Sequence, residues 1–115
     1  MALALDPTLP KSLALAIPRP GPASEFSRAL QAVMIQMNAG MCITPSANAD
    51  LDFARAMIPH HQGAVEMAKL ELLYGNDLRL RRLAQGMVVE QSQEIALMQS
   101  ILASRSTMLD TSVNP

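Results

Sequence analysis

The chain has 115 residues, of which half are apolar, only three are aromatic and nine are methionine, and its formal net charge is −1. This length suits one domain with a single core, which must be built from aliphatic and thioether side chains. The near-neutral charge gives no electrostatic basis for nucleic-acid binding, and no apolar run approaches the ~20 residues that a membrane span needs.

Five prolines mark residues 1–23, which also lack a basic start and an unbroken apolar stretch. Proline removes backbone donors and prevents continuous helix, so this segment is predicted to be an extended arm. Its pattern does not match a signal peptide. The chain therefore either stays inside the cell or has lost a leader.

A first helix is predicted over residues 25–41, with Ser24 as its N-cap. Gly40 and Pro45 end it. The short linker that follows holds the only cysteine, Cys42, so an intrachain disulfide and a CxxC redox pair are excluded. The apolar residues of this helix recur three and four positions apart, as packing on one face requires: Phe26, Leu30, Val33, Met34, Met37 and Met41.

Two longer helices are predicted over residues 50–74 and about 77–104, ahead of a frayed tail at 105–115. Gly75 supplies the C′ position just beyond the first of them, and Asn76 the N-cap of the second. Such a short connection joins helices into an antiparallel hairpin. No segment alternates with a period of two, so the chain is predicted to be all-α, with one long hairpin and one shorter helix.

The short helix cannot cover both long helices of the domain at residues 24–104. At ~1.5 Å per residue it spans ~25 Å, against ~37–42 Å for its neighbours. An apolar flank of the hairpin should therefore stay open. A homodimer that joins two hairpins into a bundle of ferritin-like, four-helix type would close it.

Polar residues interrupt the apolar stripes of the hairpin at one level. His60 and His61, the only histidines, sit inside the second helix, and Gln91 and Glu94 interrupt the third. Counted from the turn, His61 lies ~21 Å along its helix and Gln91 ~24 Å, while Met57 and Glu94 both lie ~27–28 Å along. Buried polar groups are costly unless they satisfy one another or hold a ligand. We expect these groups to form one layer across the hairpin.

Pro59 comes directly before the two histidines and is expected to kink the helix there. In a regular helix, His60 and His61 diverge by ~100° and cannot easily share one ion. We expect one histidine to aim into the hairpin core and the other at a neighbouring helix.

This layer has two interpretations. In the first, Gln91 and Glu94 hydrogen-bond the histidines, and the layer only fixes the register of a structural or interaction module without metal. In the second, imidazole and thioether groups form a borderline-soft ligand set that suits copper, and silver by extension. Met37 and Met41 then become further candidate ligands, because their helix face must pack on the hairpin.

Two motifs carry a family resemblance: M-I-P-H-H at residues 57–61 and Q-S-Q-E-I-A-L-M at residues 91–98. They resemble DUF305, a family of small and mostly exported bacterial proteins with a ferritin-like helical fold. The resemblance covers roughly residues 50–102. The chain departs from the family pattern at Met87, where Ile is usual, and at Ile101, where Trp is common.

The resemblance implies a four-helix arrangement, a periplasmic or secreted setting, and copper binding through His and Met side chains. A di-iron oxidase is not implied, because that site needs two Glu-x-x-His motifs and the chain has none. No nucleophile elbow or catalytic triad can be named either, so we expect a non-enzymatic protein. By position, the resemblance makes candidate metal ligands of Met57, His60, His61, Gln91, Glu94 and Met98.

Overall fold

The computed structural model describes residues 21–113, and it describes side chains for residues 23–106. This part of the chain forms three helices and no strand: α2 at Pro22–Met41, α3 at Ala49–Tyr74 and α4 at Leu78–Val113. The predicted all-α class is confirmed. Most of the predicted arm, residues 1–20, lies outside the described residues.

Two helices differ from their predicted bounds. α2 begins at Pro22 with Gly21 as its N-cap, because proline at the start of a helix already has a helical φ. α4 continues to Val113, past the predicted end at 104. No glycine or proline separates Gly86 from Pro115, so the sequence contains no strong stop signal for this helix.

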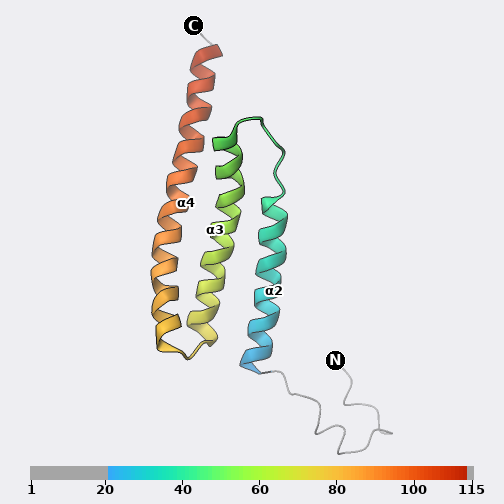
Figure 1. The fold of residues 1–115 in the computed structure, drawn as a ribbon, viewed down its shortest axis with the longest axis vertical. Coiled ribbons are helices and arrows are strands. Elements are labelled where there is room, and N and C mark those ends of the chain that lie inside the picture. Colours follow the sequence, from blue (N-terminus) through green and yellow to red (C-terminus); the bar gives the residue numbers. More distant parts are fainter. Residues whose placement is uncertain (1–20, 114–115) are drawn as a thin grey trace, which may run out of the picture.

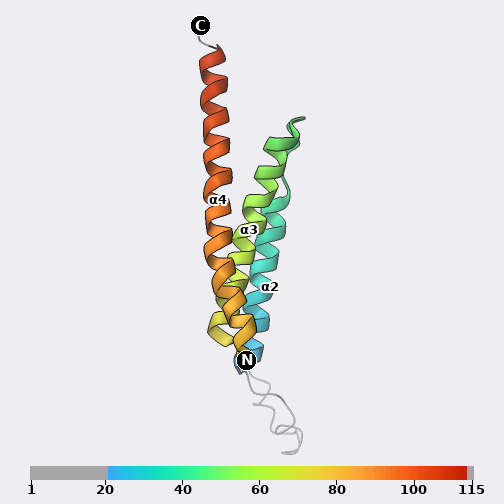
Figure 2. The same ribbon diagram turned by 60° about the vertical axis from the view of Figure 1, so that its left-hand side comes forward.

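The three helices lie side by side in a single layer, with α3 in the middle (Figure 1 and Figure 2). α3 packs against α2 on one side and against α4 on the other, whereas α2 and α4 hardly touch each other. α3 runs antiparallel to both neighbours (Figure 1). A layer one helix thick has two broad faces, and only the seams between its helices are buried.

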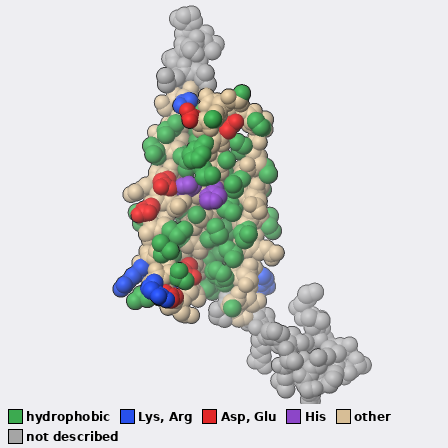
Figure 3. All heavy atoms as spheres, viewed as in Figure 1, with side chains coloured by type: hydrophobic (Ala, Val, Ile, Leu, Met, Phe, Trp, Pro, Cys, Tyr) green, Lys and Arg blue, Asp and Glu red, His purple; other side chains and the backbone are tan. Residues whose placement is uncertain are grey.

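The buried core is correspondingly thin. Its apolar members are mostly small side chains: Ala54, Ala64, Val65, Ala68, Ala84 and Met98. Many larger apolar side chains are 42% or more exposed: Met34, Ile35, Phe53, Leu73, Leu78, Leu80, Leu83, Val89, Leu97 and Ile101. Figure 3 shows apolar groups spread across one face of the layer. Extensive exposed apolar surface is typical of an interaction face. None of the described helices is both long enough and apolar enough to cross a membrane.

Two glycines allow α2 and α3 to approach closely. A Cβ atom added at Gly63 would lie 2.6 Å from Met37 Sδ, and one added at Gly40 would lie 2.6 Å from Pro59 Cβ. These distances are shorter than non-bonded carbon contacts allow, so both positions need glycine. α3 runs unbroken through Pro59.

An aspartate defines the start of α4. Asp77 Oδ1 accepts hydrogen bonds from the backbone N–H groups of Arg79 (2.9 Å) and Leu80 (3.2 Å). Asp77 is therefore the N-cap, in place of the predicted Asn76, and α4 begins at Leu78. A hydrogen bond from the Arg79 side chain is the main reason why the pKa of Asp77 lies below its usual range.

The Arg81 side chain ties α3 to α4 near this turn. Its Nη1 donates to the carbonyl oxygens of Leu72 (2.6 Å) and Gly75 (3.1 Å). Because hydrogen bonds from charged groups contribute about 1.5–3 kcal/mol, Arg81→Gln should lower the free energy of unfolding by about 1–2 kcal/mol in urea denaturation. The exposed neighbour provides the control: Arg82→Gln should change it by less than about 0.5 kcal/mol. Equal effects of the two variants would contradict this tie.

Candidate metal centre

A hydrogen bond across the α3–α4 seam fixes the orientation of His61. Its Nε2 lies 2.7 Å from Glu94 Oε2, and the imidazole is 16% exposed against 55% for the carboxylate. An ionised carboxylate can only accept hydrogen bonds, so we assign the proton to Nε2, which donates it. In the neutral ring, Nδ1 then keeps its lone pair.

This second nitrogen, His61 Nδ1, is buried and has no hydrogen-bond partner among the described residues. The same holds for Oε1 of Gln91, which lies one turn before Glu94 on α4. Buried polar atoms without a partner are rare and call for an explanation. A histidine that donates one N–H to a carboxylate while its other nitrogen stays available is typical of metal sites. The residues here therefore fit a metal ion.

His60 lies next to His61 on an open face of the layer. It is exposed, and the two ring centroids are 5.9 Å apart with 58° between the ring planes. Figure 3 shows both imidazoles at mid-height beside acidic side chains, with Lys and Arg only near the ends of the bundle. The predicted entry of one histidine into the hairpin seam holds for His61. The other histidine, His60, is predicted to point at a neighbouring helix, but its ring is exposed beside His61.

The hairpin register places Glu94 opposite His61. Counting residues from the turn places Gln91 within ~3 Å and Glu94 within ~7 Å of the level of His61. The predicted layer therefore includes all three, and the structure joins His61 to Glu94 across the seam. Met98 lies one turn beyond Glu94 and is buried.

The candidate methionines of α2 and α3 have different surroundings. Met57 is half-buried on α3, one turn before the histidines. Met41, also half-buried, follows the glycine that packs on Pro59. Because α2 and α3 are antiparallel, Met41 lies near the level of Ile58, about one turn from His61. Met37 packs against Gly63 and lines a cavity instead.

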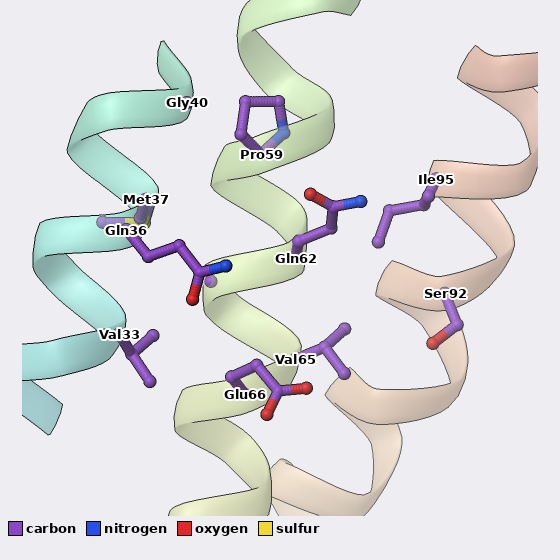
Figure 4. Close-up of a pocket in the computed structure, with 11 residues that line it drawn as sticks. Val33, Gln36, Met37, Gly40, Pro59, Gln62, Val65, Glu66, Ser92 and Ile95 are labelled. Carbon is purple, nitrogen blue, oxygen red and sulfur yellow. The ribbon is translucent and has the colours of Figure 1, made fainter. Parts of the chain in front are cut away.

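This cavity, of ≈ 570 Å³, lies on the other face of the layer. Figure 4 shows it with α2 and α4 in the reverse order from Figure 1, so the two views look at opposite faces. Neither histidine lines the cavity, which is therefore separate from the candidate metal centre. The apolar pattern of the sequence does not predict this cavity. The sequence signal that could have indicated it is the pair of glycines, Gly40 and Gly63, at which α2 and α3 approach closely. Its lining combines apolar groups with polar ones: Val33, Met37, Val65 and Ile95 with Gln36, Gln62, Glu66 and Ser92.

Within the described residues, no three His, Cys, Asp or Glu side chains lie close enough together to hold one metal ion. A metal at His61 would therefore draw its further ligands from thioether or amide groups, or from a second chain. This mixed set of ligands differs from the four Cys or His ligands of structural zinc sites and from the six to eight oxygen ligands of calcium sites. Thioether ligation is a property of soft ions.

The chain matches a known family. The sequence profile described as Domain of unknown function (DUF305) matches residues 21–102, which include all of α2 and α3 and most of α4. The chain is also similar to Uncharacterized protein L153 of Acanthamoeba polyphaga mimivirus, with 38% identity over 56 residues. That stretch covers 49% of this chain and 37% of the viral protein, so the chain spans well under half of that relative.

Proposed function

This chain belongs to the DUF305 family, and we propose that it is a non-enzymatic metal-binding protein that sequesters or carries copper. The proposed form is Cu(I), for which Ag(I) is a chemical substitute. The family resemblance also supports a periplasmic or secreted setting. The apolar surface left open by a single layer of helices supports a homodimer of four-helix-bundle type.

The observation that carries the proposal is the buried Nδ1 of His61, which has no partner among the described residues. Glu94 holds the opposite nitrogen and so keeps the ring in one orientation and one tautomer. Imidazole nitrogen combined with thioether sulfur favours Cu(I) over hard cations such as Mg²⁺. Met57 and Met41, both half-buried and each about one turn from His61, are candidate sources of the sulfur.

We assign different roles to the candidate residues. His61 and His60 are proposed as nitrogen ligands. Glu94 is a positioning residue, because its carboxylate is already engaged by His61. Gln91 is a candidate oxygen donor, because its Oε1 has no partner among the described residues. Met37 and Met98 are assigned as packing groups, because both are packed against other side chains or helices.

A titration with Cu(I) against a competing chelator tests this function. The wild-type chain should bind with a dissociation constant below about 1 µM, and the His60→Ala/His61→Ala double variant should lose this binding. Gln62→Ala is the matched control, since Gln62 adjoins His61 in sequence but lines the cavity on the other face. A folded wild-type chain that binds no copper would support the alternative, a structural or interaction module in which the His61–Glu94 pair only sets the register.

Glu94→Gln should weaken Cu(I) binding by about 10–100-fold, the usual effect of losing the outer partner of a metal-ligating histidine. Glutamine keeps the shape of the side chain but removes the charge that favours an Nε2–H tautomer. The control is Glu90→Gln, an exposed carboxylate one turn earlier on the same helix, which should leave the affinity unchanged. If both variants bind copper like the wild type, the Glu94 carboxylate does not belong to the site.

A further inference from the structure

The open face that bears the histidines is apolar along its length. On α3, residues three or four apart share this side of the helix. Phe53 and His60 are exposed there, Met57 and Met67 are half-buried, and Ala64 is buried between them. Phe53 at one end of this set is 61% exposed. Figure 3 shows apolar side chains across this face, with Lys and Arg confined to its ends. Such a face is typical of a surface that meets a partner.

The face is large enough for a stable protein interface. α3 has 26 residues, and at ~1.5 Å per residue it is ~39 Å long. Three helices spaced ~8–10 Å apart make a face about 25–30 Å wide. The resulting area of about 1,000 Å² exceeds the ~800 Å² that each partner contributes to a standard interface. A second folded surface matches this area, whereas a small molecule does not.

The histidines lie at the middle of this face. His61 is residue 13 of the 26 in α3. In a homodimer, the same patch on each copy meets about a two-fold axis. Two antiparallel α3 helices overlap most completely when that axis passes near their midpoint. Such an axis brings both histidine pairs, each with its Glu94, to the centre of the interface.

Charge at this centre favours a bound cation. The acidic side chains beside the histidines have no Lys or Arg near them on this face (Figure 3). A dimer would bring Glu94 of both copies away from water, where like charges repel more strongly. A cation at each His61 would offset this repulsion. One chain alone also lacks a cluster of three His, Cys, Asp or Glu ligands within its described part.

We propose that a second copy of this chain covers the histidine-bearing face, so that copper is bound within the dimer interface and strengthens the dimer. This inference rests on the proposed copper-binding function. It adds which surface meets the partner and a coupling between copper binding and dimerisation. The coupling follows from linkage, because a ligand that binds the dimer better than the monomer shifts the equilibrium towards the dimer.

Sedimentation equilibrium of the full chain, with and without Cu(I), tests the proposal. If copper binds only the dimer, free Cu(I) at 100 times its dissociation constant should strengthen association by about 100-fold for each ion bound, or about 10⁴-fold for one ion at each His61. Phe53→Glu should dissociate the dimer. Its matched control is Leu73→Glu, because Leu73 is 70% exposed on the same helix but lies ~200° around it, on the other face. The control should remain a dimer.

Each outcome bears on a separate part of the proposal. Dissociation by Phe53→Glu but not Leu73→Glu, with copper strengthening the wild-type dimer, supports it. A wild-type monomer that binds Cu(I), or a dimer indifferent to the copper that it binds, overturns the inference and leaves the copper function standing. A dimer that binds no copper overturns both. Leu83→Glu, on α4 three turns before Glu94, provides a second variant if Phe53→Glu does not fold.

Discussion

The His61→Ala variant should bind Cu(I) at least about 100-fold more weakly than the wild-type chain. Loss of an outer partner alone costs about 10–100-fold at metal sites, so loss of the ligand itself should reach or exceed the upper end. The fold should survive, because Glu94 is 55% exposed and can be hydrated when its partner is removed. Competition with a Cu(I) chelator measures the affinity, and circular dichroism measures the helix content.

His60→Ala is the comparison that separates the two histidines. His60 is exposed on the open face, whereas His61 is held in the seam by Glu94. An oriented ligand loses less freedom on binding, so His61 should contribute more to the affinity. A greater loss in His60→Ala than in His61→Ala would contradict the assignment of His61 as the principal ligand.

Gly40→Ala should destabilise the fold, even though alanine is the better helix former. The new Cβ would lie 2.6 Å from Pro59 Cβ, and the proline ring has no flexible end that can move aside. Overpacking of this kind costs about 1–3 kcal/mol, and the gain in helix propensity offsets only ~1 kcal/mol of it. We therefore expect a lower free energy of unfolding in urea denaturation.

Gly86→Ala is the matched control for this effect. Gly86 also lies within a helix, but a Cβ added there meets nothing within 4 Å. This variant should be more stable than the wild type by up to ~1 kcal/mol, from helix propensity alone. If both alanine variants were equally stabilised, α2 and α3 would not approach each other closely at Pro59.

Local signals in the sequence predict the helices well, whereas the exact pairing of residues across the hairpin depends on tertiary contacts. α3 ends at Tyr74 as predicted, although Gly75 follows it as an extended C-cap with φ −78°, and not in the left-handed conformation typical of helix-ending glycines. Asn76 and Asp77 are both good N-caps, and only the backbone of the turn selects Asp77. The shift is one residue, ~1.5 Å along the helix axis, so it does not determine which residue of α4 meets His61.

The polar part of the candidate site could be predicted, but not the role of each group. Histidines inside an apolar stripe predict a buried polar layer, and the structure forms its His61–Glu94 pair, in which Glu94 is 55% exposed. Which nitrogen of His61 stays available depends on a contact across the seam, and sequence spacing does not contain that contact. Met37 illustrates the same limit, because its packing against Gly63 depends on how α2 sits on α3.

Nitrogen-15 NMR of the imidazole rings tests the central claim most directly. Cu(I) and Ag(I) are both diamagnetic, so the two ring nitrogens of His61 can be followed as metal is added. The claim predicts that Nε2 is protonated before and after addition, held by Glu94, and that the Nδ1 resonance shifts on binding. Saturating metal that leaves Nδ1 unchanged, or that binds Nε2 and breaks the bond to Glu94, would contradict it.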